Sequence, residues 1–427
     1  MFEHPDLAVD GPGEEPLVGP NEWVASPDVV VVDAREVDRR AVPALKTHRI
    51  VLGDDGDRLF AAGVADMDFR IAPAVLDALR TRIEHGVFGY ETVPDGLLPA
   101  LTDWLQSQHG WTVDPGHILR APNVLNSLSM ALSLFSTAGD GIIVQPPVFF
   151  DFYDIVKENG RKLVANPLVL EDGRYRMDFD QLAKVASQPR NRIVFLCNPH
   201  NPVGRVWSRD ELRTMGEICA RNEVLVVSDE IHGDITFGGH AYTPFAALGP
   251  EFANNSITCL SPAKSFNIAS CCSAFTVVSN DEMRASFQAE NSRLTINKNN
   301  AFANVAMEAA YRQGGPWLDA VLDYLCGNLI EVRTWLKRIP GVDLIEPEGT
   351  FLLWIDFRAL ELEPEELTIF LRNDAAWAVT RGPAFGDQGI GFVRLNIACT
   401  RARLVAALGR LSEAVESLRA RQNSGKT

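Results

Sequence analysis

Three segments of this sequence place side chains capable of acid, base or nucleophilic chemistry directly after short apolar runs. Asn201 follows the first of these runs, Asp229 the second and Lys264 the third. In open α/β sheets, ligands bind beyond the carboxyl ends of the strands. If the runs are strands of one sheet, an amide, a carboxylate and an amine converge on one crevice.

This combination suits a pyridoxal 5′-phosphate (PLP) site. Such a site needs an amine that forms a Schiff base with the cofactor, a carboxylate that keeps the pyridine nitrogen protonated and a hydrogen-bond donor to the ring phenolate. Lys264 would become a general base and acid once a substrate displaces it from the cofactor. Taken singly, a lysine after a strand is usually a surface residue, and a strand-end aspartate such as Asp229 is usually a cap or turn residue. The prediction therefore depends on the ordered combination.

The elements that must position these residues can be read from the pattern of apolar residues. The runs at 141–144, 193–196, 224–227 and 257–260 are short and β-rich, as expected of strands covered on both faces. Helical periodicity lies between them, as in residues 209–222. This alternation predicts a mostly parallel α/β sheet.

A second, smaller unit is expected from the ends of the chain. Helical periodicity at 72–83 and 97–105 precedes the strands of the large sheet, and a long helical stretch from about 303 to 336 follows them. A strand at 351–355 and a final helix at 402–420 complete the pattern of a smaller α+β domain. The predicted organisation is an N-terminal arm at 1–45 that is mobile or loosely docked and has no chemical role, a small domain from 46–73 and 315–427, and a large domain at 74–314.

Composition limits the partners. The net charge of −16 argues against nucleic acid, because a protein that contacts phosphates needs a basic surface. No run approaches the roughly 18 apolar residues of a membrane span, and no signal peptide is evident at the N-terminus, so no membrane partner and a cytoplasmic location are expected. The seven cysteines are scattered and odd in number, which fits reduced thiols and no metal site.

The order of the motifs is typical of a known group of enzymes. An NPxNPxG motif from Asn198 to Gly204, then Asp229, then an SxxK motif from Ser261 to Lys264 resembles fold-type I PLP enzymes of the class I and II aminotransferase superfamily. Within it, the chain resembles the MalY/PatB group of cystathionine β-lyases (cysteine-S-conjugate β-lyases) over roughly residues 60–415. This resemblance implies an aspartate-aminotransferase-like α/β fold with a large, mostly parallel domain and a smaller α+β domain. Further segments that carry it are 65–69, 85–90, 145–148, 228–232 and 392–396.

Carried over by position, the resemblance implies the principal site residues. Lys264 would bind the cofactor as a Schiff base, Asp229 would face the pyridinium nitrogen and Asn201 the phenolic oxygen. Arg394 would hold the substrate α-carboxylate with two hydrogen bonds, a task suited to a planar guanidinium. Tyr90 matches a tyrosine that reaches the cofactor phosphate across a dimer interface, which implies a homodimer with shared active sites.

The resemblance also implies a second group of contacts. Ser261 and the backbone N–H groups of Val124 and Leu125, at the start of a helix, would bind the cofactor phosphate. Phe149 would stack on the cofactor ring, and His232 occupies a position next to the cofactor. Ala65, from the segment 65–69, is expected beside the substrate.

Several residues depart from the pattern of the lyase group. Phe149 and Phe150 stand where that group usually has two tyrosines, and Thr380 and Arg381 stand where it tends to have an Asn-Asp-like pair. A phenol that could relay a proton is therefore missing. These changes leave the predicted cofactor residues in place and put the outcome of the reaction in question.

The leading hypothesis is β-elimination from a small-molecule S-substituted cysteine, which yields a thiol, pyruvate and ammonia. The alternatives are aminotransfer and decarboxylation coupled to oxidative deamination of an S-substituted cysteine, as in natural-product relatives. A hypothesis of a different class is a regulatory role, because some members of the MalY-like group also bind transcription regulators.

Overall fold

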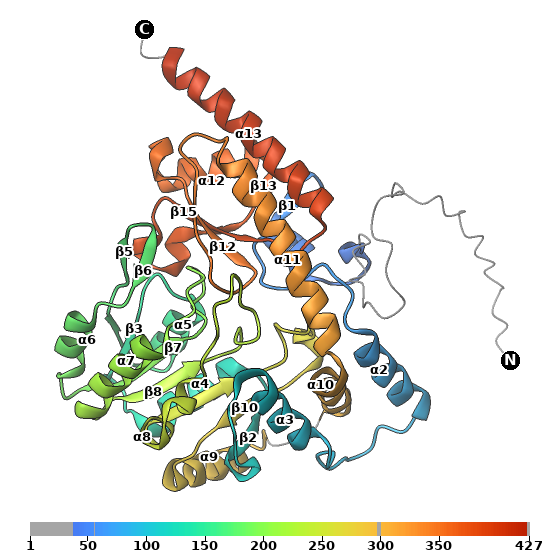
Figure 1. Ribbon diagram of the computed structural model, residues 1–427, viewed down its shortest axis with the longest axis vertical. Coiled ribbons are helices and arrows are strands. Elements are labelled where there is room, and N and C mark those ends of the chain that lie inside the picture. Colours follow the sequence, from blue (N-terminus) through green and yellow to red (C-terminus); the bar gives the residue numbers. More distant parts are fainter. Residues whose placement is uncertain (1–36, 55, 297–299, 425–427) are drawn as a thin grey trace, which may run out of the picture.

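A seven-stranded sheet forms the centre of the larger part of the molecule (Figure 1). In the computed structural model, which describes residues 37–424 except 55 and 297–299, the strand order is β2-β10-β9-β8-β7-β3-β4. Only β10 of this sheet runs antiparallel to its neighbours. The strands are β2 (Ile118–Ala121), β3 (Gly141–Val144), β4 (Lys162–Ala165), β7 (Asn191–Cys197), β8 (Leu225–Asp229), β9 (Ser256–Leu260) and β10 (Ala274–Val277).

The mostly parallel sheet predicted from the apolar runs is confirmed, and the runs correspond to β3, β7, β8 and β9. Alternate side chains of each strand point to opposite faces. In β7, for example, Val194 belongs to the apolar cluster on one face and Phe195 to the cluster on the other. One face is covered by α4 (Val124–Phe135), α5 (Asp151–Glu158) and α9 (Asp281–Arg293), and the other by α6 (Phe179–Ala186), α7 (Arg209–Arg221) and α8 (Pro250–Asn254).

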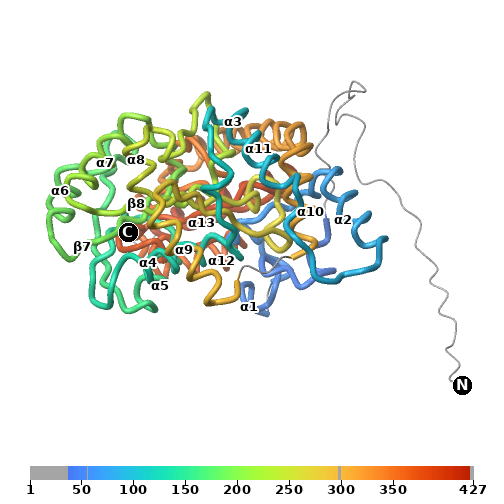
Figure 2. The backbone as a smooth tube through the Cα atoms, turned by 90° about the horizontal axis from the view of Figure 1, so that it is seen from below, coloured from blue at the N-terminus to red at the C-terminus, as the bar shows by residue number. Residues whose placement is uncertain are grey.

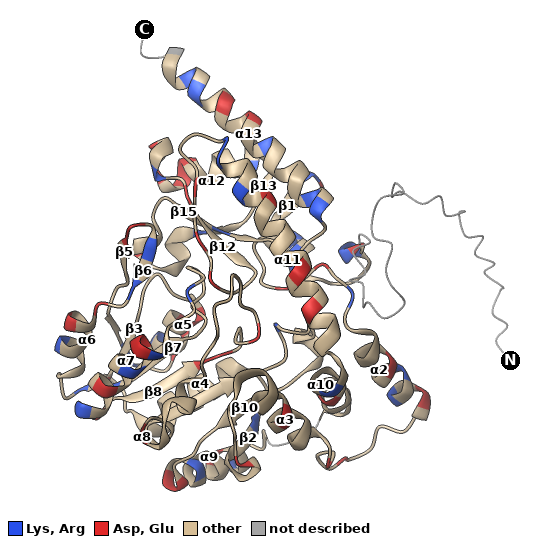
Figure 3. Cartoon of the chain, viewed as in Figure 1, with Lys and Arg blue, Asp and Glu red and all other residues tan. Residues whose placement is uncertain are grey.

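The charged residues are distributed according to the layers of helices and strands. Figure 3 shows the charged residues mainly on the helices, while the central strands are almost free of them. Asp229 at the end of β8 is an exception: it lies in a wholly buried strand. A carboxylate in such a position is costly unless it has a partner.

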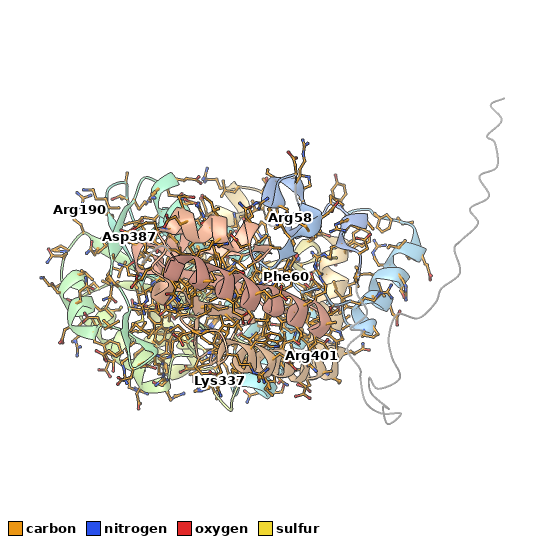
Figure 4. All side chains as sticks on the ribbon, turned by 90° about the horizontal axis from the view of Figure 1, so that it is seen from above. Arg58, Phe60, Arg190, Lys337, Asp387 and Arg401 are labelled. Carbon is orange, nitrogen blue, oxygen red and sulfur yellow. The ribbon has the colours of Figure 1, made fainter. Side chains whose placement is uncertain are left out.

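The smaller part contains a four-stranded antiparallel sheet with the order β11-β12-β15-β14. Its helices α11 and α13 contribute Leu325, Leu329, Leu404 and Leu408 to a single apolar cluster. In Figure 4, Arg401 marks the first residue of α13. The elements of this part are α11 (Gly315–Leu336), β11 (Asp343–Ile345), β12 (Leu352–Asp356), α12 (Pro364–Asn373), β14 (Thr380–Arg381), β15 (Phe392–Asn396) and α13 (Arg401–Ser424).

The long helical stretch expected from about 303 to 336 is two helices, α10 (Ala301–Gln313) and α11, which meet at Gly314. A Cβ at Gly314 would lie 2.4 Å from the carbonyl oxygen of Ala310 and 2.5 Å from the ring of Phe266. The absence of a side chain at this position therefore allows the change of direction. Figure 1 shows α11 rising from the large part into the small one.

The N-terminal segment reaches the small sheet, because the backbone carbonyl of Ala62 accepts a hydrogen bond of 2.9 Å from the N–H of Asn396 in β15. Figure 2 shows this segment in blue. The predicted arm at 1–45 falls mostly outside the described residues, but its last part is packed against the protein. Lys46 is buried and pairs with Asp68 at 2.9 Å, and Arg39 lies 3.2 Å from the same carboxylate. The other oxygen of Asp68 lies 3.3 Å from Arg403 of α13.

The remaining elements frame these two parts. Helices α2 and α3 pack against α10 on the large part.

The predicted boundaries between the two domains remain a prediction. Among residues 37–424 as described, no helix is both long and apolar enough to cross a membrane. The remaining elements are α1 (Arg49–Leu52), β1 (Phe60–Ala61), which pairs with β13 (Trp377–Ala378), α2 (Pro73–His85), α3 (Leu97–His109) and the hairpin β5 (Val169–Glu171) with β6 (Arg174–Arg176).

Candidate active site

A cavity of about 300 Å³ lies beyond the carboxyl ends of β7, β8 and β9, where the sequence predicted a crevice. We call it the inner cavity. The predicted residues of the cofactor site other than Tyr90 line it together with Ala65; the full set is Ala65, Val124, Leu125, Phe149, Asn201, Asp229, His232, Ser261 and Lys264.

Lys264 presents its amine to this cavity. Its Nζ donates a hydrogen bond of 2.6 Å to the backbone carbonyl of Ala65. Burial lowers the pKa of the amine, and the nearby charge of Arg394 lowers it further, whereas Asp66 and Asp229 act in the opposite direction. The structure therefore favours the neutral, nucleophilic form of this amine more than water does.

Hydrogen bonds to Asp234 fix the loop that carries Lys264. The next residue, Ser265, donates through Oγ to the carboxylate of Asp234 at 2.5 Å. The same carboxylate accepts from Trp104 Nε1 at 2.9 Å and lies 2.8 Å from His109 Nε2. Asp234 is thus held by two side chains of α3 and restricts the position of the lysine backbone.

A second connection joins this loop to the segment that contains Ala65. Asn267 has a φ of +56°, and its side chain accepts from the backbone N–H of Met67 at 2.9 Å. Its amide group donates to the carbonyls of Met67 and Phe69. The hydrogen bond between Lys264 and Ala65 is therefore one part of a fixed contact between two chain segments.

Asp229 ends β8 inside the inner cavity. Its Oδ1 accepts from the backbone N–H of Ile231 at 3.2 Å. Burial raises the pKa of this carboxyl group to about 6, and the positive charge of Lys264 offsets part of that effect. A cationic group placed beside Asp229 would stabilise the carboxylate and would in turn be kept protonated.

Arg394 comes from β15 of the small sheet and is buried beside this cavity. Its Nη1 donates to Asn201 Oδ1 at 3.0 Å, and its Nη2 donates to the carbonyl of Gly63 at 2.8 Å and to Thr380 Oγ1 at 3.3 Å. Its Nε has no hydrogen-bond partner. No carboxylate among the described residues forms an ion pair with Arg394, and burial lowers its pKa to about 9.

His232 and Phe149 provide two faces of the inner cavity. His232 is buried, and its Nδ1 has no hydrogen-bond partner. Burial, together with the charges of Lys264 and Arg394, holds the pKa of this imidazole well below its usual value, so the ring is neutral. Phe149 packs against Phe150 with ring centroids 4.9 Å apart.

The end of the cavity at α4 favours an anion. Asn123 caps the helix by accepting from the backbone N–H of Asn126 at 2.8 Å. The first N–H groups of a helix have no acceptor within the helix and carry partial positive charge, so Val124 and Leu125 present such groups to the cavity. The Oγ of Ser261 lies on the same wall and donates to the carbonyl of Ser273 at 2.9 Å.

Tyr90 lies apart from the inner cavity. Its side chain is fully exposed, and it lines a surface groove with residues of α2 and α10. A single chain does not bring Tyr90 to Lys264, so its assignment to the site remains a prediction that requires a second copy.

Asp151, the first residue of α5, also lines the inner cavity and was not predicted from the sequence. Burial raises the pKa of its carboxyl group, the neighbouring Asp154 raises it further, and Lys264 and Arg394 oppose this effect. The signal was available in principle, because Asp151 follows the loop after a predicted strand. Cys272 also lines the cavity, with Sγ 3.5 Å from Ser261 Oγ.

Comparison with known proteins agrees with this arrangement. The model of the aminotransferase class I and II family matches residues 60–411. The chain belongs to this family. It is 42% identical over 353 residues to cystathionine β-lyase PatB of Bacillus subtilis (strain 168), a match that covers 82% of this chain and 91% of that protein.

Two further relatives extend the comparison. Protein MalY of Escherichia coli (strain K12) is 32% identical over 359 residues, which cover 83% of this chain and 91% of that protein. The crystal structure of cystalysin from Treponema denticola, which contains a PLP cofactor, superposes with a TM-score of 0.87. It shares 29% identity and covers 91% of this chain and 100% of that chain. The resemblance and the fold class predicted from the sequence are thus confirmed.

Proposed function

We propose that this protein is a PLP-dependent carbon–sulfur β-lyase, which converts an S-substituted cysteine into a thiol, pyruvate and ammonia. The observation that carries the proposal is one cavity that combines the amine of Lys264, the carboxylate of Asp229 and the amide of Asn201, with Arg394 directly beside it. The names of the lyase relatives in the family support the choice of reaction.

The residues present fit the cofactor. The buried Nδ1 of His232 and Nε of Arg394 are without partners, as expected where a polar ligand completes the site. Asp229 would face a protonated pyridine nitrogen, Asn201 the ring oxygen, and the start of α4 with Ser261 the phosphate. When bound, PLP supplies an electron sink that stabilises negative charge at the substrate Cα.

Arg394 would orient the substrate. Its guanidinium lies between Asn201 Oδ1, 3.0 Å away, and the carbonyl of Gly63, 2.8 Å away, so its plane is fixed before any ligand arrives. An unpaired, buried guanidinium favours a planar anion such as an α-carboxylate. Two hydrogen bonds to that group would hold Cα at a constant position relative to Lys264.

Lys264 would move the proton. Its lowered pKa makes the free amine available to accept the proton of Cα, and the carbonyl of Ala65 at 2.6 Å restrains the position of Nζ. The overall reaction breaks the Cα–H and Cβ–S bonds. The sulfur leaves with the bonding electron pair and takes up a proton, and one water molecule is consumed as pyruvate and ammonia form.

The active form would be a homodimer with shared active sites. Apolar side chains around Tyr90 are exposed in the single chain, among them Val87 and Phe88. Exposed apolar groups of this kind, next to a surface groove, are typical of an interface. Tyr90 would then reach the phosphate in the partner's inner cavity. A cytoplasmic location also belongs to this proposal.

The test is an absorbance spectrum of the purified protein with PLP, followed by assays with S-methyl-L-cysteine for pyruvate, thiol, carbon dioxide and pyridoxamine phosphate. We expect a band near the visible edge that is absent from Lys264→Ala, and pyruvate equal to thiol. Absence of that band in the unmodified protein would contradict the cofactor assignment. Release of carbon dioxide with oxygen uptake, or accumulation of pyridoxamine phosphate without thiol, would assign the protein to oxidative decarboxylation or to aminotransfer.

A further inference from the structure

A second cavity, of about 490 Å³, adjoins the inner one. We call it the outer cavity. Ala65, Phe149 and Lys264 line both, so the two spaces meet at the amine of Lys264. Arg394 lines the outer cavity as well. A substrate whose α-carboxylate binds Arg394 would therefore place its side chain within reach of this second space.

The walls of the outer cavity are mainly apolar. Leu371 of α12 and Trp377 of β13 are buried parts of the small domain's core, and Val379 follows them. The N-terminal segment supplies Leu45 and Val51, which are 57% and 40% exposed although both are large and apolar. An apolar group in the cavity would cover part of this surface and gain the corresponding hydrophobic stabilisation.

The charges that line the outer cavity are of one sign. Lys264, Arg372, Arg381 and Arg394 border it, and no aspartate or glutamate is among the described residues that line it. Lys264 and Arg394 serve the reaction centre. Arg381 forms an exposed ion pair with Glu365 at 3.0 Å, which compensates its charge.

Arg372 of α12 is the basic residue of the outer cavity that has neither a role at the reaction centre nor an ion pair among the described residues. Its Nη2 donates to the backbone carbonyl of Leu52, and no carboxylate among residues 37–424 as described pairs with it. A guanidinium has five N–H donors, so most of its capacity is unused. The contact with Leu52 holds it at the junction of α12 and the N-terminal segment.

We infer that the outer cavity receives the S-substituent of the substrate, and that it selects a substituent with an apolar body and an anionic end, which Arg372 binds. This inference rests on the proposed lyase function and specifies its substrate class. A substituent that ends in an ammonium group would meet basic residues and no carboxylate, so the site selects against it.

The first experiment compares three substrates that share an S-benzyl group. They are S-benzyl-L-cysteine and its para-carboxy and para-aminomethyl derivatives, assayed with the PLP-loaded enzyme for thiol and pyruvate. We expect kcat/KM to be about tenfold higher for the carboxylate than for S-benzyl-L-cysteine, since charge-assisted hydrogen bonds are stronger than neutral ones. The aminomethyl derivative is expected to be the poorest substrate. Equal values for all three would overturn the inference.

The second experiment assigns the preference to Arg372. In Arg372→Gln, the ratio of kcat/KM between the carboxylated and the plain benzyl substrate should fall from about ten to about one, and Arg372→Lys should restore part of it. Arg58→Gln is the matched control, because Arg58 is an exposed arginine outside both cavities (Figure 4) and loses the same charge. A ratio that stays near ten in Arg372→Gln would overturn the role of this residue.

A binding measurement separates this inference from the proposed reaction. Analogues in which a methylene replaces the sulfur cannot lose their side chain, so their Kd values report the outer cavity whatever the reaction is. Calorimetric titration of the PLP-loaded enzyme should give the same order, with the carboxylated analogue tightest. If no sulfur substrate yields pyruvate but this order holds, the lyase proposal fails and the selectivity stands. If pyruvate forms and the order is absent, the selectivity fails alone.

Discussion

Two buried arginines, Arg205 and Arg394, differ in how they are compensated. Arg205 donates to Glu348 at 2.9 Å through Nε, to Glu211 at 2.9 Å through Nη2 and to the carbonyl of Tyr175 through Nη1. Arg394 donates to an amide, a carbonyl and a hydroxyl, and within the described part of the chain its Nε has no partner and no carboxylate pairs with it.

The difference separates a structural charge from a functional one. A buried charge costs free energy unless paired, and the protein around Arg205 supplies the pairs itself. Around Arg394, the described residues supply no carboxylate, so the anion that pairs with this arginine would come from a bound ligand. The lowered pKa of Arg394, about 9, reflects this incomplete site. Substitutions at the two arginines should therefore have opposite consequences for stability and catalysis.

The largest effect on activity is expected from Arg394→Met. Removing two charge-assisted hydrogen bonds to the substrate carboxylate should lower kcat/KM by about a thousandfold. The free energy of unfolding of the cofactor-free protein should stay equal or increase, because an unpaired buried charge is removed. Steady-state kinetics and urea unfolding test the two parts. A large loss of stability would show that Arg394 is a structural residue like Arg205.

The counterpart is Arg205→Met. This substitution leaves Glu348 buried with Arg174, at 2.7 Å, and the backbone N–H of Val206, at 2.9 Å, as its remaining partners among the described residues. The free energy of unfolding should therefore fall by roughly 3 to 5 kcal/mol. The kcat of the folded fraction should change little, because Arg205 lines neither cavity. In the double variant Arg205→Met with Glu348→Gln, part of the stability should return. Failure to recover any would contradict the ion-pair explanation.

The third test concerns Asp229, which resembles Arg394 in being a buried charge without an ionic partner. Its pKa is raised to about 6, so folding of the cofactor-free protein favours the protonated form. Below about pH 4, Asp229 therefore does not change the free energy of unfolding. Between about pH 4 and pH 6 it lowers this free energy increasingly, and above about pH 6 the loss reaches roughly 3 kcal/mol. Asp229→Asn should remove this loss and also lower activity. Identical urea midpoints of both proteins at pH 8 would contradict the prediction.

The smallest effect is expected from Thr380→Val. It removes one hydrogen bond of 3.3 Å to Arg394 and one of 3.0 Å to the carbonyl of Gly63, while Arg394 keeps its other partners. We expect KM to rise about fivefold with kcat nearly constant, the magnitude of one net hydrogen bond. A fall in kcat with unchanged KM would indicate that Thr380 takes part in the chemical step.

Much of the inner cavity could be predicted because parallel strands bring their carboxyl ends together. Asn201, Asp229 and Lys264 each follow an apolar run, and the sheet order places those runs side by side. The apolar runs in the sequence mark the strands, and the parallel sheet then places the residues after these strands at one edge, so these site residues can be predicted. The antiparallel β10 was not predicted, since an apolar strand buried on both faces has no direction in its pattern.

The outer cavity could not be predicted, for a different reason. Leu45, Arg372 and Lys264 are far apart in the sequence, and their meeting depends on how the small domain and the N-terminal segment pack. Asp151 was missed because an acidic residue at the start of a helix is usual without any function. Residues 1–36 lie outside the described part of the chain, so most of the predicted arm stays untested.

The carboxylate of Asp68 joins the two ends of the described chain, because Lys46 and Arg39 approach it from the start and Arg403 from the final helix. The protein therefore has a minimum length for expression and engineering. A version that begins after Lys46 would leave Arg403 as the one cation paired with Asp68 among the described residues, and it would remove Leu45 from the outer cavity. Shortening up to residue 38 leaves these contacts of Asp68 in place.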